Sequence, residues 1–200
     1  MKRITALLYH DFTTLDALGP LEVLGRLPGY EIRYASLSGG PVSNEKGLVV
    51  MTEALSSPGP GDILLIPGGM GSRQLVLQDD FLAALHKAAL ESTLVMTVCT
   101  GSALAAAAGL LDGLHATGNK RAFDWTMSMG KKVLWQRDAR WTRDGKFYTA
   151  AGVSAGIWPW DLWRIILAGK GPYPWQRAWS MAGMKSPRMA GASRDRGNRA

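Results

Sequence analysis

The single cysteine of the chain, Cys99, lies where an apolar, β-branched run gives way to a Thr-Gly pair and an alanine-rich segment. A sharp turn from strand to helix at this point would project the thiol outward. The partial positive charge of a helix N-terminus would also lower the pKa of the thiol toward the physiological range. We therefore predict that Cys99 is a nucleophile. The alternative interpretation is a small buried packing residue, which is the usual role of a lone cysteine after an apolar run.

Two other segments carry groups with complementary chemistry. Asp16 opens an apolar segment of helical character and is either an acid that faces Cys99 or a simple helix cap. The turn Gly68-Gly69-Met70 follows an apolar strand, and its backbone N–H groups are expected to stabilise a developing negative charge, because glycines permit a close approach. An ordinary connection is the alternative for this turn.

Strands and helices alternate along the chain, which predicts how these groups are positioned. Strands are expected at residues 3–9, 31–38, 47–55, 62–67 and 94–98, and a hairpin through 143–145. Helices are expected from residue 15 with Pro20 in the first turn, after the glycine turn, at 81–92, at 101–111, and at 121–130 with Gly130 as the C-cap. This alternation predicts an α/β, flavodoxin-like layered fold with a mostly parallel central sheet flanked by helices. Asp16, the glycine turn and Cys99 then converge at the carboxyl edge of the sheet.

Composition narrows the class of protein. Two hundred residues, of which 46% are hydrophobic, suffice for one domain with a sizeable core. No apolar stretch reaches the roughly 18 residues of a membrane span, and the first residues are typical of a strand, not of a secretory signal. One cysteine cannot form an internal disulfide, which fits a cytoplasmic protein. With three scattered histidines it also lacks the spacing of a metal site, so we predict no metal.

Four motifs together resemble a known family. They are TLDALGPLEVL, LLIPGGMG, VCTGSALAAAAGLLDGLHAT and YTAAGVSAGI, and in this order and spacing they are similar to the ThiJ/PfpI superfamily, within it the branch that contains isonitrile hydratases. The resemblance covers residues 3–157. It implies that residues 1–157 form the ThiJ/PfpI-like domain.

The resemblance also implies a set of site residues and an activity. Cys99 matches the elbow nucleophile, Asp16 matches the acid that faces it, and Thr100 is expected to hydrogen-bond near the nucleophile. Gly152 and Val153 are expected beside the substrate. The implied reaction adds water to a small isonitrile through a cysteine thioimidate and releases an N-substituted formamide, without a cofactor. A homodimer and a small-molecule substrate are the implied partners.

The residue after the nucleophile separates branches of the superfamily. Protease-like and many glyoxalase-like members carry Cys-His there, whereas this chain carries Cys99-Thr100, and its acid is an aspartate where glyoxalases and deglycases use a glutamate. Peptidase and glyoxalase activities are therefore disfavoured. One departure from the hydratases lies at residues 118–121, where Gly-Asn-Lys-Arg replaces a Thr-His-Trp pattern, so the pocket wall is expected to differ. The remaining alternatives are a small-molecule sensor that retains the pocket and a redox-sensing thiol protein.

Residues 158–200 form a segment of different composition. This segment holds five of the eight tryptophans and six of the seven net positive charges. Arg- and Trp-rich sequence of this kind can indicate nucleic-acid binding. We instead interpret the segment as an out-of-frame replacement of the family's C-terminal helices and expect no nucleic-acid partner. Codons for Trp158-Pro159-Trp160-Asp161, shifted in frame, encode the Met-Ala-Leu-Gly type of sequence with which this branch continues, and a second stretch recovers the expected ending.

Resequencing the gene tests this frameshift hypothesis. We expect an alternative reading frame, beginning near codon 157, that encodes two family-like helices. A gene with no such frame would contradict the hypothesis.

Overall fold

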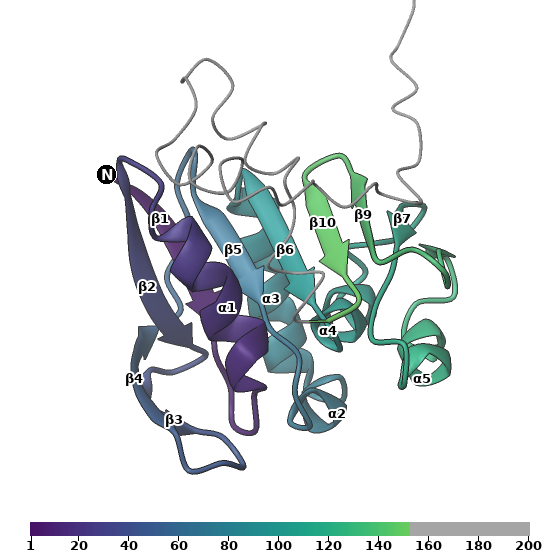
Figure 1. Cartoon of the computed structure of the whole chain (residues 1–200), viewed down its shortest axis with the longest axis horizontal. Helices are drawn as coiled ribbons and strands as arrows, with labels where there is room; N and C mark the ends of the chain where they lie inside the picture. The colour runs from purple at the N-terminus through teal and green to yellow at the C-terminus, as the bar shows by residue number, and fades with distance from the viewer. Residues whose placement is uncertain (153–200) are drawn as a thin grey trace, which may run out of the picture. The chain divides into compact units, whose positions relative to one another are not determined.

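The computed structural model describes residues 1–152, and its main feature is an eight-stranded sheet with the order β3-β4-β2-β1-β5-β6-β10-β9 (Figure 1). The strands of this sheet are β1 (Lys2–Leu7), β2 (Tyr30–Ser36), β3 (Gly40–Ser43), β4 (Val49–Ala54), β5 (Ile63–Ile66), β6 (Leu94–Val98), β9 (Trp141–Asp144) and β10 (Phe147–Ala150). The edge pairs β3–β4 and β10–β9 are antiparallel, and the five other pairings are parallel. The mostly parallel α/β sheet predicted from the sequence is therefore confirmed.

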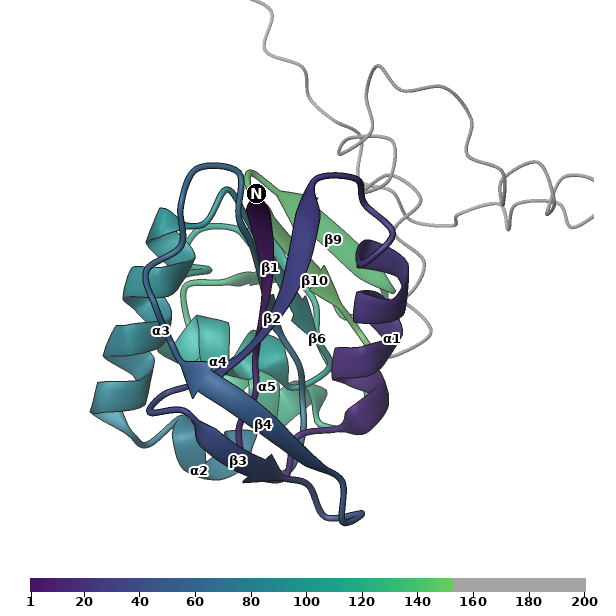
Figure 2. The same cartoon turned by 90° about the vertical axis from the view of Figure 1, so that its left-hand side faces the viewer.

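Helices lie on both faces of this sheet and complete the layered, flavodoxin-like arrangement. The helices are α1 (Thr14–Leu24), α2 (Ser72–Leu75), α3 (Asp79–Glu91), α4 (Gly101–Ala107) and α5 (Phe123–Ser128). Helix α1 lies against one face, and α3 and α4 lie against the other (Figure 2). The short strands β7 (His115–Ala116) and β8 (Leu134–Trp135) pair separately.

The central strands and α4 form the core on which the site is built. All four residues of β5 are buried, as their continuous apolar run predicts for a strand covered on both faces. Burying one such side chain contributes about 1.5–3 kcal/mol. Small residues let α4 pack closely. A Cβ at Gly101 would lie 2.3 Å from the carbonyl oxygen of Ile66, so only glycine allows the helix to begin this near to β5.

Several sequence-based boundaries were wrong. Strand β3, which forms a hairpin with β4, was not predicted, and neither was the β7–β8 pair. Pro20 lies inside α1 and not in its first turn. Helix α5 ends at Ser128 with Met129 as its C-cap, one residue before the predicted Gly130. Apart from the position of Pro20, these differences concern short edge strands and element ends, where the apolar pattern carries little information.

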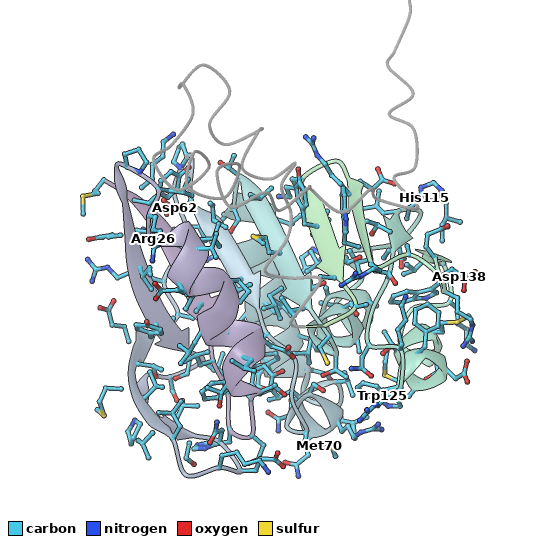
Figure 3. The ribbon with its side chains drawn as sticks, viewed as in Figure 1. Arg26, Asp62, Met70, His115, Trp125 and Asp138 are labelled. Carbon is cyan, nitrogen blue, oxygen red and sulfur yellow. The ribbon has the colours of Figure 1, made fainter. Side chains whose placement is uncertain are left out.

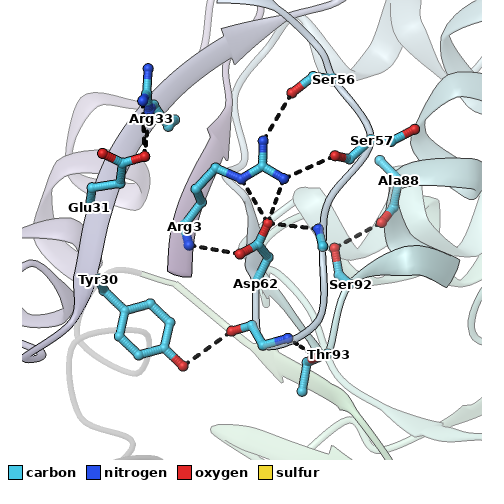
Figure 4. A network of polar contacts seen from close by, with 12 residues as sticks. Arg3, Tyr30, Glu31, Arg33, Ser56, Ser57, Asp62, Ala88, Ser92 and Thr93 are labelled. Carbon is cyan, nitrogen blue, oxygen red and sulfur yellow. Dashed lines mark hydrogen bonds and ion pairs between the residues drawn. The ribbon is translucent and has the colours of Figure 1, made fainter. Parts of the chain in front are cut away.

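An ion pair between the buried Asp62 and the partly exposed Arg3 holds the amino-terminal ends of β1 and β5 side by side (Figure 4). Asp62 accepts hydrogen bonds from the backbone N–H of Arg3 at 2.7 Å, from the guanidinium of Arg3 at 2.8 Å and from the N–H of Gly59 at 2.8 Å. Burial alone would raise the pKa of Asp62, but these bonds outweigh it and lower the pKa. The ion pair therefore sets the alignment of two strands whose opposite ends carry candidate site residues.

No helix within residues 1–152 is long and apolar enough to cross a membrane. The predictions made for Val153 and for the segment 158–200 concern residues outside the described part of the chain.

We predict that Asp62→Asn lowers the free energy of unfolding at pH 7 by about 1–3 kcal/mol, because a buried charge-assisted hydrogen-bond set is weakened. The folded pKa of Asp62 is lowered, so this stabilisation is present above the ordinary aspartate pKa and is lost as the pH falls below it. Urea unfolding at several pH values measures the difference. Glu22→Gln is the control, since it breaks only the exposed pair with Arg26. Equal stability of the two variants at pH 7 would contradict the prediction.

Candidate active site

Cys99 lies in a sharp turn between β6 and α4, as predicted for a nucleophile elbow. Its φ angle of 58° is left-handed, a conformation that costs a non-glycine residue about 1–3 kcal/mol. Hydrogen bonds hold this backbone in place. The Cys99 N–H donates to the Ala150 carbonyl at 2.9 Å, and the Cys99 carbonyl accepts from the Ser102 hydroxyl at 2.9 Å and from the Asn119 N–H at 3.3 Å. The thiol is therefore presented by a conformation that neighbouring strands and loops enforce.

The backbone of Gly68 brings Cys99 and Asp16 together. A Cβ at Gly68 would lie 2.7 Å from the Cys99 Cβ, 2.7 Å from the Thr100 nitrogen and 2.8 Å from Asp16 Oδ2. Because all three groups surround the same point, any side chain at position 68 would separate them. The predicted convergence of Asp16, the glycine turn and Cys99 is thus present in the structure.

The Asp16 carboxyl group is 1% exposed and lies in the first turn of α1. Neither of its oxygens makes a hydrogen bond of normal geometry within the described residues. Burial raises the pKa of Asp16 to about 6, although nearby contacts with the Cys99 thiol and the Gly68 N–H oppose this rise. An acid with this pKa both accepts and donates protons near neutral pH. The alternative interpretation, a helix cap, does not fit, because Thr13 is the N-cap of α1 and no side chain makes a capping hydrogen bond there.

The surroundings of Cys99 favour the protonated form of its thiol. Burial first, and the Asp16 carboxylate second, raise the pKa of Cys99 to about 12, although hydrogen bonds from Asn119 and the Thr100 N–H lower it. The sequence-based prediction of a pKa near neutrality was therefore wrong. The seven-residue helix α4 that follows does not offset desolvation and a neighbouring negative charge. The two shifts together favour a negative charge on Asp16 over one on Cys99 at pH 7.

The glycine turn positions the site through bonds that it makes within the protein. The Gly69 N–H donates to the Thr100 hydroxyl at 3.0 Å, so the predicted role of this N–H as an oxyanion donor is not available in the free protein. A Cβ at Gly69 would lie 2.2 Å from the Asp11 carbonyl oxygen. The side chain of Met70 is 60% exposed. The Gly69 N–H therefore supports the elbow, and an oxyanion role for the rest of the turn remains a prediction.

Thr100 contacts the nucleophile through its backbone and the glycine turn through its side chain. Its N–H lowers the pKa of the Cys99 thiol. Its hydroxyl bonds to Gly69 and lies 3.1 Å from the Ser72 hydroxyl. Thr100 thus links the elbow to the turn, which agrees with the predicted position near the nucleophile.

Gly152 follows β10 and is half-buried, and no atom of residues 1–152 lies within 4 Å of the position that a Cβ would occupy. Its strand ends beside the elbow, because the carbonyl of Ala150 accepts the Cys99 N–H. A substrate contact by Gly152 remains a prediction.

Asn119 is the site residue that the sequence analysis missed. Its amide nitrogen lies 2.8 Å from Cys99 Sγ, and it comes from the loop between β7 and α5. The one signal in the sequence was the departure at residues 118–121, which predicts a changed pocket wall but not a contact with sulfur.

Helices α2 and α5 are linked by a cation–π contact. The Arg73 guanidinium of α2 lies 4.4 Å from the centre of the Trp125 ring of α5.

The three histidines are all engaged away from the thiol. His10 bonds to Ser43, His86 to the Ala108 carbonyl and His115 to Asp144. Figure 3 shows His115 well separated from Met70, which belongs to the glycine turn, and Asp62 at the opposite end of the sheet. Among residues 1–152, no three His, Cys, Asp or Glu side chains are grouped to hold a metal ion.

The structure combines a layered α/β sheet with a buried acid that faces a cysteine elbow. Comparison with known protein families assigns a chain with these features to one family. The model of the DJ-1/PfpI family matches residues 2–158, and the chain belongs to this family.

Two relatives and one solved structure illustrate the similarity. The chain is 32% identical over 156 residues to the isonitrile hydratase of Pseudomonas putida. The aligned region covers 78% of this chain and 67% of that protein. It is 25% identical over 161 residues to a deglycase of Pyrococcus horikoshii, with 79% and 94% covered. The crystal structure of a ThiJ/PfpI family protein from Pseudomonas syringae superposes with a TM-score of 0.74 at 27% identity, over 96% of this chain and 79% of that one.

We predict that Asp16→Asn makes Cys99 more reactive toward iodoacetamide at pH 8, by severalfold, because the substitution removes the negative charge that helps to raise the thiol pKa. The same variant gains roughly 1–3 kcal/mol of stability at pH 7. The folded pKa of Asp16 is raised, so its ionisation destabilises the protein above pH 6, and this gain shrinks toward zero as the pH falls to 4.

Alkylation followed by mass spectrometry and urea unfolding measure the two effects. Asp11→Asn is the matched control, because Asp11 is exposed and lies in the loop just before α1. Unchanged or slower alkylation of Asp16→Asn would contradict the electrostatic coupling of the pair.

Proposed function

We propose that this protein is a cysteine-dependent hydratase that adds water to a small isonitrile and releases an N-substituted formamide. The observation that carries the proposal is the buried Asp16 carboxyl group that faces the Cys99 elbow across the backbone of Gly68. Burial raises the pKa of this acid to about 6, which suits it to move protons near neutral pH. The 32% identity to a hydratase of this kind supports the same chemistry.

The isonitrile carbon suits this pair, because it accepts both a nucleophile and a proton. In the first step the Cys99 Sγ attacks the terminal carbon of R–N≡C while Asp16 accepts the thiol proton. Asp16 then delivers that proton to the same carbon, which gives the thioimidate R–N=CH–S–Cys99. The S–H bond breaks as the S–C bond forms, so no free thiolate is needed in the resting protein.

Asp16 also serves the second half of the reaction. As a carboxylate it accepts a proton from water while the water oxygen attacks the thioimidate carbon, and it delivers this proton to the nitrogen. The tetrahedral adduct R–NH–CH(OH)–S–Cys99 then collapses as the C–S bond breaks. Asp16 accepts the hydroxyl proton of the adduct and passes it to the departing Cys99 sulfur. The sum is R–N≡C plus water to R–NH–CHO, and the one carboxyl group acts as base and then as acid in each step.

Other chemistries known for this superfamily fit the site less well. No histidine of the chain contacts Cys99, which removes the His-assisted thiolate that a peptidase requires. A redox-sensing thiol has a low pKa, whereas burial and Asp16 raise that of Cys99. We also propose a cytoplasmic homodimer, as the family resemblance implies.

The experiment measures isonitrile loss and formamide appearance for a panel of uncharged alkyl and aryl isonitriles. We expect turnover by the wild type, loss of more than about 10³-fold in Cys99→Ser, and a loss of about 10²–10⁴-fold in Asp16→Asn. The value of kcat/KM should fall tenfold per pH unit below about pH 6, because the Asp16 carboxylate becomes protonated there. The Asp11→Asn control should retain activity.

Loss of turnover in Asp16→Asn together with faster alkylation of its thiol would identify proton transfer, not thiol reactivity, as the role of Asp16. Turnover that survives Cys99→Ser would contradict the mechanism. Binding of isonitriles without turnover would favour the small-molecule sensor instead.

A further inference from the structure

A second polar group, from a residue outside the predicted site, contacts the reacting sulfur. The Asn119 amide nitrogen lies 2.8 Å from Cys99 Sγ, and the Asn119 backbone N–H donates to the Cys99 carbonyl at 3.3 Å. Asn119 therefore binds both the side chain and the backbone of the nucleophile. Neither the family resemblance nor the pattern around Cys99 assigns it a role.

The orientation of the Asn119 amide follows from a third bond. Its Oδ1 accepts a hydrogen bond from the Ala122 N–H at 2.9 Å, just before α5. A backbone N–H can only donate, so the atom that faces it must be the amide oxygen. The group that faces Cys99 Sγ is consequently the NH₂, which donates to sulfur and cannot accept from it.

The loop that carries Asn119 is held on both sides. A Cβ at Gly118 would lie 2.3 Å from the Ser102 hydroxyl, so the backbone packs directly against the start of α4. The Lys120 ammonium binds the Thr117 hydroxyl and the carbonyls of Arg137 and Ala139. The amide is thus preorganised before any substrate binds.

A donor and an acceptor now contact the thiol, and they determine where its hydrogen points. The Asn119 NH₂ repels an S–H hydrogen, whereas the Asp16 carboxylate attracts it. We propose that Asn119 is a catalytic hydrogen-bond donor that directs the thiol hydrogen toward Asp16 and stabilises the negative charge on sulfur as that proton leaves. The inference rests on the proposed function only for its place in the reaction, since the effect on the thiol exists without substrate.

The Asn119 amide also affects how activity depends on pH. A histidine at this position would titrate between pH 5 and 8, but an asparagine amide does not. Asp16 is then the group at the site whose ionisation controls activity in that range. The acidic limb of the profile should follow one ionisation.

The test is the rate at which iodoacetamide alkylates Cys99 in the full-length chain from pH 7 to 10. Asn119→Leu keeps the volume and removes the donor, and we expect alkylation about threefold slower or more at every pH. This fall corresponds to a thiol pKa raised by about one unit, partly offset by the greater nucleophilicity of a more basic thiolate. Asn119→Asp keeps the acceptor for Ala122 and adds a negative charge, so its alkylation should be at least about tenfold slower.

Arg121→Ala, an exposed change two residues away, is the matched control and should react like the wild type. Thermal melting of each variant reports whether it is folded. Alkylation of folded Asn119→Leu at the wild-type rate or faster would overturn the inference. Slower alkylation in a protein that turns over no isonitrile would sustain it while the proposed function failed, so the two failures are distinguishable.

Discussion

The site depends on one steric constraint, the absence of a side chain at Gly68. Its backbone lies beside the Cys99 Cβ, the Thr100 nitrogen and an oxygen of Asp16, each of which lies less than 3 Å from where a Cβ would be. The elbow, the glycine turn and α1 approach one another because of this contact. Gly101 and Gly118 allow the same close approach around the elbow, at the carbonyl of Ile66 and the hydroxyl of Ser102. At the far end of the sheet, the Arg3–Asp62 ion pair aligns β1 with β5.

Close packing also determines the electrostatics. Excluding water from a carboxylate and a thiol disfavours the charged form of both, so the pKa of Asp16 rises to about 6 and that of Cys99 to about 12. These shifts favour a negative charge on Asp16 over one on Cys99 at neutral pH. This arrangement suits a substrate whose carbon takes up the thiol proton, and it suits a redox thiol poorly. Asn119 completes the pair, because it offers sulfur a donor where Asp16 offers an acceptor.

Much of this site could be predicted from the sequence. The features that could not be predicted each have a physical reason. Apolar runs of β5 and β6 indicate buried parallel strands, and strand ends of one sheet meet at one edge, which is why Asp16, Gly68 and Cys99 could be grouped. The pKa of Cys99 was predicted in the wrong direction, because a helix terminus is visible in sequence but burial beside a carboxylate is not. The Gly69 N–H was expected to be free, although Thr100 occupies it. Asn119 is 20 residues from Cys99 in a loop without a pattern, so only the fold reveals its contact with sulfur.

The central claim is that the resting site holds a neutral Cys99 thiol beside an ionised Asp16 carboxylate. A ¹³C NMR titration of the full-length chain, labelled at the Cys99 Cβ and the aspartate Cγ atoms, measures both groups at once, with Cys99→Ser and Asp16→Asn used for assignment. We expect Asp16 to titrate near pH 6 and the Cys99 signal to remain that of a thiol beyond pH 9. A Cys99 signal that becomes a thiolate below pH 8, or an Asp16 signal that titrates near pH 4, would contradict the claim.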